Sequence, residues 1–172
     1  MDGRLKEMTA VLKKYKLTHG LTPEKFRLIL QELGPTYIKL GQIMSLPSDI
    51  LPKEYCDELM KLFSDVEPMP FEQVEAVIDA SFGYSWKDVF ASIDKKPLGA
   101  ASIAQVHRAT LKTGEQVVVK VQRKGIHEVM SKDMALLHKA VKLVPPISIK
   151  GIVDFDMVLD EMWAVAQEEM NF

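Results

Sequence analysis

The sequence predicts an α+β fold in which helices come first, an antiparallel two-stranded hairpin follows, and helices return. Three observations predict this order. Prolines in the first half each precede a stretch with apolar residues at helical spacing. The apolar runs 102–109 and 115–122 contain β-branched residues and are joined by a connection with Gly114. An apolar pattern of helical period then resumes from Ile126 to Val144.

Proline and glycine mark the ends of the predicted helices in the first half. Thr22 is an N-cap residue before Pro23 at the first helical position, and the stretch ends at Gly34. Pro35 begins the next helix in the same way. The apolar stripes consist of Phe26, Leu30 and Leu33; of Tyr55, Leu59, Leu62 and Phe63 after Pro52; and of Val74, Val77 and Ile78 between Pro70 and Gly83.

The second half changes in character near Ile93, where the hairpin region begins. The helix that follows the hairpin is broken by Pro145 and Pro146, and a last helix runs from Asp154 to the end of the chain. A length of 172 residues first suggests one domain, because domains average roughly 150 residues.

Composition excludes several classes of protein. Lysine and arginine number 22 against 24 aspartates and glutamates, so the net charge of −2 provides no basic field for nucleic acid. Cys56 is the only cysteine, which excludes an internal disulfide and a cysteine zinc site and suits a reducing compartment. Neither a signal peptide nor an apolar run of membrane-spanning length is visible, so any membrane contact would be peripheral.

The predicted helix 37–44 places Lys39 and Gln42 between apolar residues on both sides. A lysine in such a slot needs an anion or an ammonium group that reaches water, and the pattern alone leaves both open. Gly41 lies in the middle of this helix, where glycine costs about 1 kcal/mol and usually marks the close approach of another backbone or a ligand.

Lys120 ends the β-branched run 117–119 and alternates onto the same face as Val118 and Gln122. Inside a buried strand it would need a carboxylate or phosphate partner, whereas on an edge strand it would prevent aggregation. The small residues of the segment 97–102 before the hairpin would let a backbone approach a ligand closely, although the segment lacks the glycine pattern of a kinase loop.

The last helix has one misplaced carboxylate. Its apolar stripe consists of Phe155, Val158, Leu159, Met162 and Ala166. Glu169 falls within that stripe and therefore needs a cation, and we expect Lys39, Lys120 and Glu169 to converge on one site. We expect three other acidic residues of this helix to be solvated surface charges: Asp160, Glu161 and Glu168. We expect Gln105 and His107 to be structural groups with satisfied hydrogen bonds. The histidines do not have the spacing of metal ligands: His19, His107, His127 and His138.

Three motifs resemble those of the UbiB/AarF/ADCK family of atypical protein-kinase-like proteins. Residues 39–42 (KLGQ) resemble the KxGQ motif, residues 100–107 (AASIAQVH) the alanine-rich loop and its strand, and residues 117–120 (VVVK) the nucleotide-lysine motif. The resemblance is continuous from about Leu33 to the end of the chain. It implies a protein-kinase-like N-lobe preceded by a helical KxGQ extension, with ATP-binding kinase or ATPase activity in isoprenoid-lipid, often ubiquinone, biology.

The resemblance also implies roles for individual residues. Lys120 would contact the nucleotide phosphates, helped by the loop that replaces the glycine-rich loop. That loop consists of Gly99, Ala100, Ala101, Ser102, Ile103 and Ala104. Lys39 and Gln42 would lie on a helix across the active cleft and gate it, and Glu169 would pair with Lys39 as the first residue of the family's E-x-D. The sequence departs from the family at Asn171, Pro47 and Lys124, and Asn171 leaves the second carboxylate of E-x-D missing.

By the same resemblance, residues 1–90 form the helical extension and residues 91–172 the N-lobe, truncated in its main helix. The C-lobe, with the catalytic and metal-binding aspartates, is not in this chain, so we expect the chain to be the N-terminal part of the protein and to bind ATP or ADP with Mg²⁺ whose ligands lie elsewhere. The expected partners are an adenine nucleotide and, at full length, an isoprenoid lipid or membrane surface. We expect a cytoplasmic location, with membrane association left open.

A non-catalytic interaction module is the alternative. In that case the helical extension would dock on a protein or membrane, for example through Met8, Leu12 and Tyr15 and the lysines among them.

Overall fold

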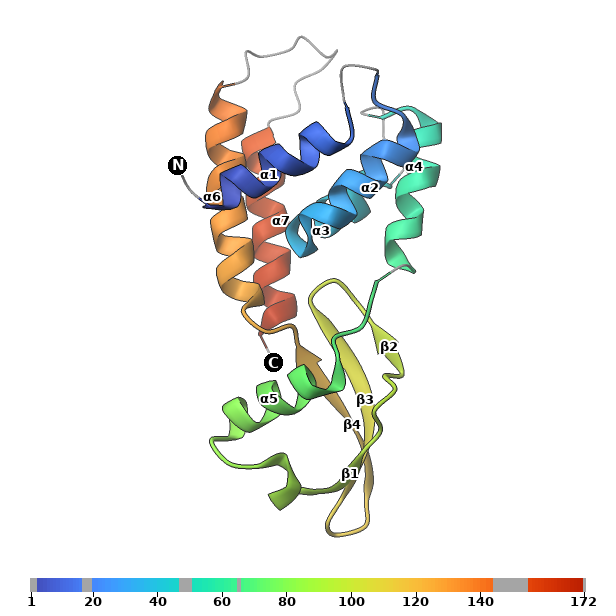
Figure 1. Ribbon diagram of the computed structural model, residues 1–172, viewed down its shortest axis with the longest axis vertical. Helices are drawn as coiled ribbons and strands as arrows, with labels where there is room; N and C mark the ends of the chain where they lie inside the picture. The colour runs from blue at the N-terminus through green and yellow to red at the C-terminus, as the bar shows by residue number, and fades with distance from the viewer. Residues whose placement is uncertain (1–2, 17–19, 47–50, 65, 144–154, 172) are drawn as a thin grey trace. The chain divides into compact units, whose positions relative to one another are not determined.

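The computed structural model describes residues 3–16, 20–46, 51–64, 66–143 and 155–171 (Figure 1). In chain order these form α1 (Gly3–Lys14), α2 (Pro23–Leu33), α3 (Pro35–Met44), α4 (Lys53–Leu59), the 3-10 helix η2 (Met60–Phe63), α5 (Phe71–Phe82), the 3-10 helix η3 (Trp86–Asp88), β1 (Phe90–Ile93), β2 (Gly99–Ala100), β3 (Ala104–Leu111), β4 (Gln116–Gln122), α6 (Ile126–Leu143) and α7 (Phe155–Met170). The chain divides into two compact units, a helical unit of Met1–Asp65 with Glu128–Phe172 and a sheet unit of Val66–His127.

Local sequence explains where α2 and α3 begin. The hydroxyl of Thr22 accepts a hydrogen bond from the backbone N–H of Lys25 at 3.2 Å, which satisfies one of the unpaired donors of the first turn of α2. Gly34 separates α2 from α3 with a φ of 101°, a backbone conformation that residues with a side chain rarely adopt. Pro35 then occupies the first turn of α3, where its missing N–H is not needed.

Helix α3 lies between two apolar clusters of the helical unit. On one side, Tyr37 packs into a buried cluster with α1, α2, α4 and η2, which includes Leu30, Leu59 and Leu62. On the other side, Leu40 and Ile43 pack against Met134 of α6 and against Leu159 and Met162 of α7. Apolar clusters therefore cover both flanks of α3, and its polar residues Lys39 and Gln42 lie between these clusters.

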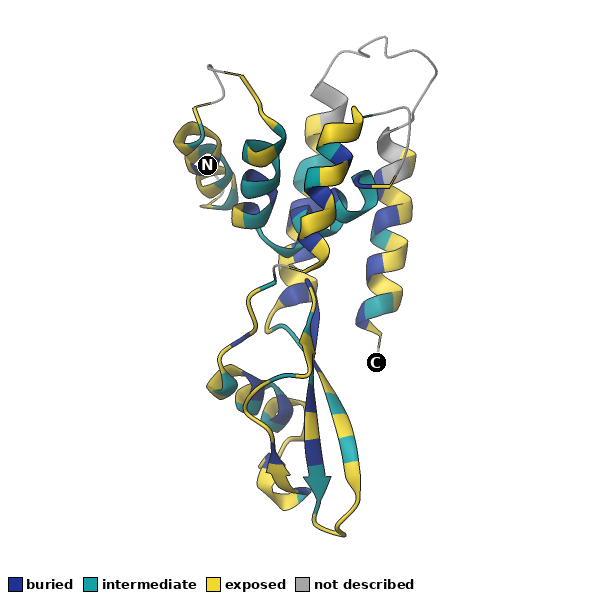
Figure 2. Cartoon of the chain, turned by 90° about the vertical axis from the view of Figure 1, so that its right-hand side faces the viewer, coloured by how far each residue is buried: buried dark blue, intermediate teal, exposed yellow. Residues whose placement is uncertain are grey.

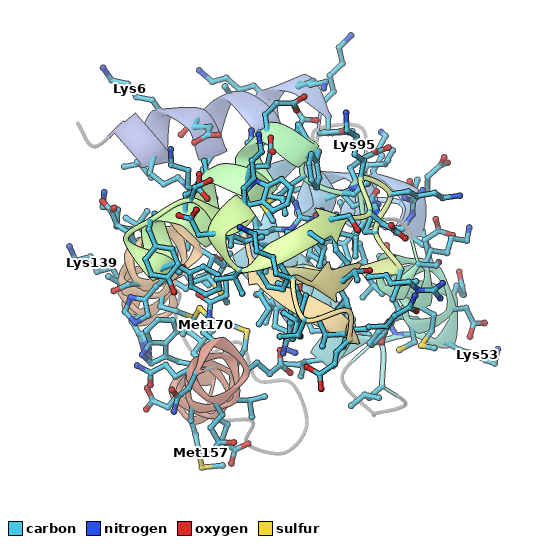
Figure 3. The ribbon with its side chains drawn as sticks, turned by 90° about the horizontal axis from the view of Figure 1, so that it is seen from below. Lys6, Lys53, Lys95, Lys139, Met157 and Met170 are labelled. Carbon is cyan, nitrogen blue, oxygen red and sulfur yellow. The ribbon has the colours of Figure 1, made fainter. Side chains whose placement is uncertain are left out.

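The surface of this unit carries outward-pointing lysines together with some exposed apolar side chains. Lys6, Lys53 and Lys139 point outward from three different helices in Figure 3. On α7, Met157 is 57% exposed, whereas Met170 is buried with 8% of its surface exposed.

The sheet unit is built around β3, the longest strand. β4 pairs antiparallel along β3 from Ala104 to Thr110, while β1 and β2 pair with opposite ends of the other edge of β3. The buried face of the sheet packs on α5 and η3. Its cluster consists of Met69, Val74, Ile78, Trp86, Phe90, Ile93, Ala109 and Val121. Gly83 ends α5 in the left-handed conformation, with a φ of 76°.

The structure confirms the predicted order of helices, hairpin and helices, and it adds elements that the sequence did not predict. The short strands β1 and β2 were not expected, because four and two residues are too few to show an alternation. The helix break at Pro145 and Pro146 and the start of the last helix at Asp154 lie outside the described residues. The predicted domain boundary between residues 90 and 91 follows the family resemblance and stays a prediction. The two compact units of the structure divide the chain differently, with α6 and α7 in the same unit as the N-terminal helices.

Candidate functional site

Lys39 of α3 pairs with Glu169 of α7. The ammonium nitrogen of Lys39 lies 2.5 Å from Oε1 of Glu169, although 130 residues separate the two in sequence. The Lys39 side chain is 14% exposed and that of Glu169 is 41% exposed. Of the two interpretations that the sequence left open for Lys39, the paired lysine is the one that the structure shows, and its expected partner is the one present. The gating role of the pair stays a prediction.

Gln42 and Gly41 connect α3 to η2. The amide of Gln42 donates to the backbone carbonyl of Leu62 at 3.1 Å, so this side chain joins two elements of the helical unit. A Cβ atom built on Gly41 would meet the Cδ1 atoms of the buried residues Leu62 and Leu30. Gly41 therefore marks the close approach of two leucine side chains, neither a backbone nor a ligand. The gating role of Gln42 likewise stays a prediction.

A buried polar cluster that the sequence analysis missed holds the N-terminal end of α3. Asp133 of α6 is fully buried and accepts hydrogen bonds from Arg4 Nε at 2.7 Å, from Arg4 Nη2 at 2.8 Å and from the hydroxyl of Thr36 at 2.8 Å. Arg4 also donates to the carbonyl of Leu33, the last residue of α2. The hydrogen bond to Asp133 raises the pKa of Arg4 above its usual value. Only the spacing of Asp133 among apolar residues of the helix 126–144 could have signalled this cluster.

Lys120 lies on the exposed face of β4. Among the described strands β4 pairs only with β3. Lys120 is exposed, as is Val118 with 64% of its surface accessible. Figure 2 shows exposed and buried residues interspersed along the strands of the sheet unit. Of the two interpretations that the sequence left open for Lys120, the structure therefore shows the exposed lysine of an edge strand and not the lysine inside a buried strand. The physical reason is that α5 and η3 cover only the opposite face, where Val121 packs. The expected convergence of Lys120 with Lys39 and Glu169 stays a prediction, since Lys120 belongs to the sheet unit.

The small-residue segment 99–104 begins in β2, on the opposite edge of β3 from the lysine strand β4. Val106 of β3 is the register partner of both Gly99 in β2 and Lys120 in β4, so these three residues form one row across the sheet. The N–H of Ala101 donates to the carbonyl of Ala104 at 2.7 Å, which closes a tight turn between β2 and β3. Among the described residues, the backbone N–H groups of Ser102 and Ile103 in this turn donate to no carbonyl or side chain.

Gln105 and His107 form a buried network under this turn. The Oε1 atom of Gln105 accepts from the N–H of Met69 at 2.6 Å, and its Nε2 lies 2.8 Å from His107 Nε2. His107 Nδ1 lies 2.7 Å from the carbonyl of Asp94. Because a carbonyl only accepts and an amide nitrogen only donates, His107 is neutral with its proton on Nδ1. Both residues are structural, as predicted.

The remaining predictions concern surface charges, residues outside the described ranges and the expected membrane-docking face. Asp160, Glu161 and Glu168 are exposed, as expected for solvated charges. Pro47 lies outside the described residues, as do the side chains of Phe155 and Val158. The face expected to dock on a membrane is partly covered, because Met8 and Tyr15 pack against the core of the helical unit while Leu12 is 40% exposed. No helix within the described ranges is long and apolar enough to cross a membrane.

Comparisons with known proteins match most of the chain. The profile of the ABC1 atypical kinase-like domain matches residues 61–172. An uncharacterised protein from the hydrogenase 1 5′ region of Clostridium pasteurianum is 38% identical over 98% of this chain and 34% of its own length. A probable protein kinase UbiB of Pseudomonas fluorescens is 49% identical over 66% of this chain and 21% of its own length.

A solved structure also resembles the chain. The complex of Rv3197 with erythromycin from Mycobacterium tuberculosis is 27% identical, with a TM-score of 0.48 over 95% of this chain and 40% of that chain. The present chain thus spans between a fifth and two fifths of the length of these three proteins. The family profile covers more than half of the chain, and probable UbiB protein kinases are among the relatives of the chain. The chain therefore belongs to the ABC1 atypical kinase-like family.

Proposed function

We propose that this chain supplies the phosphate-binding part of a UbiB-type, ATP-dependent atypical kinase or ATPase. Lys120 is the cation that contacts the phosphates, and the segment 99–104 contributes backbone N–H groups. A bound MgATP would supply the phosphoryl group that is transferred or hydrolysed, with Mg²⁺ held by residues outside this chain. The link to ubiquinone-like lipids rests on the family resemblance and on the name UbiB among the relatives.

The observation that carries this proposal is the row of Gly99, Val106 and Lys120 across three strands. It sets a lysine on the same sheet face as a glycine at the start of a turn of small residues. Two consecutive N–H groups of that turn, those of Ser102 and Ile103, lack a partner among the described residues. Consecutive N–H groups of this kind bind phosphate oxygens, and a nearby lysine adds a point charge.

Nucleotide-dependent thermal stabilisation of the 172-residue chain tests the proposal. A ligand at about 100 times its Kd adds about 2.7 kcal/mol of stability, which raises the Tm by several degrees. We expect this rise with saturating MgADP, and we expect Lys120→Ala to abolish most of it. The matched control is Lys112→Ala, which removes another exposed lysine, from the hairpin turn, and should keep the full rise.

The alternative function predicts a different result. If the folded chain shows no shift with saturating MgADP or MgATP, the proposal fails and a non-catalytic interaction module is the better description. A shift that Lys120→Ala leaves unchanged would retain nucleotide binding but remove Lys120 from the site.

A further inference from the structure

Arg123, the first residue after β4, ties three backbone carbonyls together. Its side chain donates from Nε to the carbonyl of Ala101 at 3.1 Å and from Nη2 to the carbonyl of Glu67 at 2.6 Å. Its own backbone N–H donates to the carbonyl of Ile103 at 2.9 Å. One residue therefore fixes two alternate carbonyls of the turn between β2 and β3 and attaches them to the segment that precedes α5.

The partners of Arg123 are unusual for an arginine. Both of these side-chain hydrogen bonds are to neutral carbonyls, and within the part of the chain that the structure describes Arg123 forms no ion pair with a carboxylate. Burial lowers the pKa of its guanidinium. A planar guanidinium offers several donors in fixed directions, so it can bridge two carbonyls where the single nitrogen of a lysine cannot hold the same geometry.

Planarity of the peptide bond links this contact to the proposed phosphate donors. The carbonyl of Ala101 and the N–H of Ser102 belong to one peptide group, and the structure has no cis peptide bond among its described residues. In a trans peptide group these two bonds point in opposite directions. Holding the carbonyl of Ala101 toward Arg123 therefore aims the N–H of Ser102 away from the guanidinium, and Ser102 is one of the residues whose N–H has no partner among the described residues.

The side chains of this turn fix its conformation only in part. Ile103 is buried at one end, but Ala101 beside it in the turn is small and has no side chain that could hold its own peptide group. A backbone with free dihedrals there would have to be ordered when a ligand binds. Arg123 follows Lys120 by three residues, so it attaches the turn to the end of the strand that carries this lysine. The order of the turn is thereby established before any ligand arrives.

Resting on the proposed nucleotide site, we propose that Arg123 is a positioning residue that holds the turn 101–104 with its N–H groups ready for the nucleotide phosphates. It acts through the Ala101 carbonyl and makes no phosphate contact itself. The inference predicts a loss of affinity that depends on the phosphates of the ligand, because the nucleoside part does not need the turn.

The test compares MgADP and adenosine by titration calorimetry on the unaltered chain, Arg123→Gln, Arg123→Lys and the control Lys112→Gln. We expect both Arg123 variants to bind MgADP about 10-fold more weakly and adenosine with unchanged affinity, since a tenfold loss corresponds to the 1.4 kcal/mol of ordering a residue or two. We expect Lys112→Gln to match the unaltered chain. Hydrogen exchange of the Ala101 amide, which bonds to Ala104, should quicken in both Arg123 variants.

Three results would overturn the positioning role of Arg123. Full MgADP affinity in Arg123→Lys would show that charge alone suffices and would overturn the positioning role, as would an equal loss for MgADP and adenosine. Unchanged exchange at Ala101 would also overturn it, and this arm needs no ligand. If the unaltered chain binds neither ligand, both the proposed function and this inference are wrong. If the unaltered chain and Arg123→Gln bind MgADP equally well, only the inference is wrong.

Discussion

At the scale of single residues, the KxGQ motif is explained in part by packing. The glycine at position 41 is buried, and its missing Cβ makes room for leucines from α2 and η2. The neighbouring Gln42 holds η2 through the carbonyl of Leu62. With Leu40, which packs against α6 and α7, three of the four motif residues therefore fix the position of α3 within the helical unit, and Lys39 is the member that makes a charged contact.

Gly41→Ala should destabilise the chain even though alanine favours helices. The added Cβ would lie 2.8 Å from Leu30 Cδ1 and closer still to Leu62 Cδ1, and both leucines are buried at 4% and 1% exposure. Overpacking costs about 1 to 3 kcal/mol, which exceeds the gain of about 1 kcal/mol in helix propensity. Urea unfolding followed by circular dichroism measures the difference. Gly3→Ala, where no atom lies within 4 Å of the new Cβ, is the control and should not lower stability.

At the scale of elements, the sequence predicts what local signals determine. Thr22 with Pro23 and Gly83 mark helix ends because capping and backbone conformation are decided within a few residues. The hairpin is predicted for the same reason, with Gly114 at a φ of 96° in its turn. Strands β1 and β2 are too short for a pattern, and their pairing with β3 is decided by contacts distant in sequence.

In the candidate site too, local sequence predicts which residues matter, whereas their surroundings depend on contacts distant in sequence. The identity of Lys39, Glu169 and Lys120 came from motifs and from their position among apolar residues. The exposure of Lys120 depends on which sheet face α5 covers, and the sequence around the lysine does not contain that information. The cluster of Arg4 with Asp133 joins residues 129 positions apart, which no local pattern reveals.

Removal of Arg4 should loosen the attachment of α1 to α6. The side chain of Asp133 is 0% exposed, so Arg4→Met would leave a buried carboxylate that still accepts the hydrogen bond of the Thr36 hydroxyl but has lost its cation. Breaking one side of a buried ion pair costs about 3 to 5 kcal/mol. Urea unfolding should show this loss, whereas Glu7→Gln, which removes the exposed partner of Arg4, should change stability by less than about 0.5 kcal/mol. Equal effects of the two variants would contradict the assignment of the buried partner.

At the scale of the whole chain, the helical unit is formed by two segments that are distant in sequence. Residues from Met1 to Asp65 combine with residues from Glu128 onward, and the sheet unit lies between them in the sequence. Contacts between the two segments therefore close a long loop, whose entropic cost grows only slowly with its length. The KxGQ helix is joined to the C-terminal segment by the apolar contacts of α3 with α6 and α7, by the hydrogen bond from Thr36 to Asp133 and by the pair of Lys39 with Glu169.

The pair of Lys39 and Glu169 should couple more strongly than a surface pair, and its two halves should respond unequally to removal. Lys39→Met leaves Glu169, which is 41% exposed and can be hydrated, whereas Glu169→Gln leaves an ammonium that is only 14% exposed. We therefore expect the second variant to lose more stability. A double-mutant cycle should give a coupling of about 1 kcal/mol at low salt, and it should fall in 1 M NaCl, where the Debye length is about 3 Å. The matched control is Lys132 with Glu128, exposed at 61% and 73%, for which we expect less than about 0.5 kcal/mol. A coupling no larger than that of the control would show that α3 and α7 are held together by their apolar contacts alone.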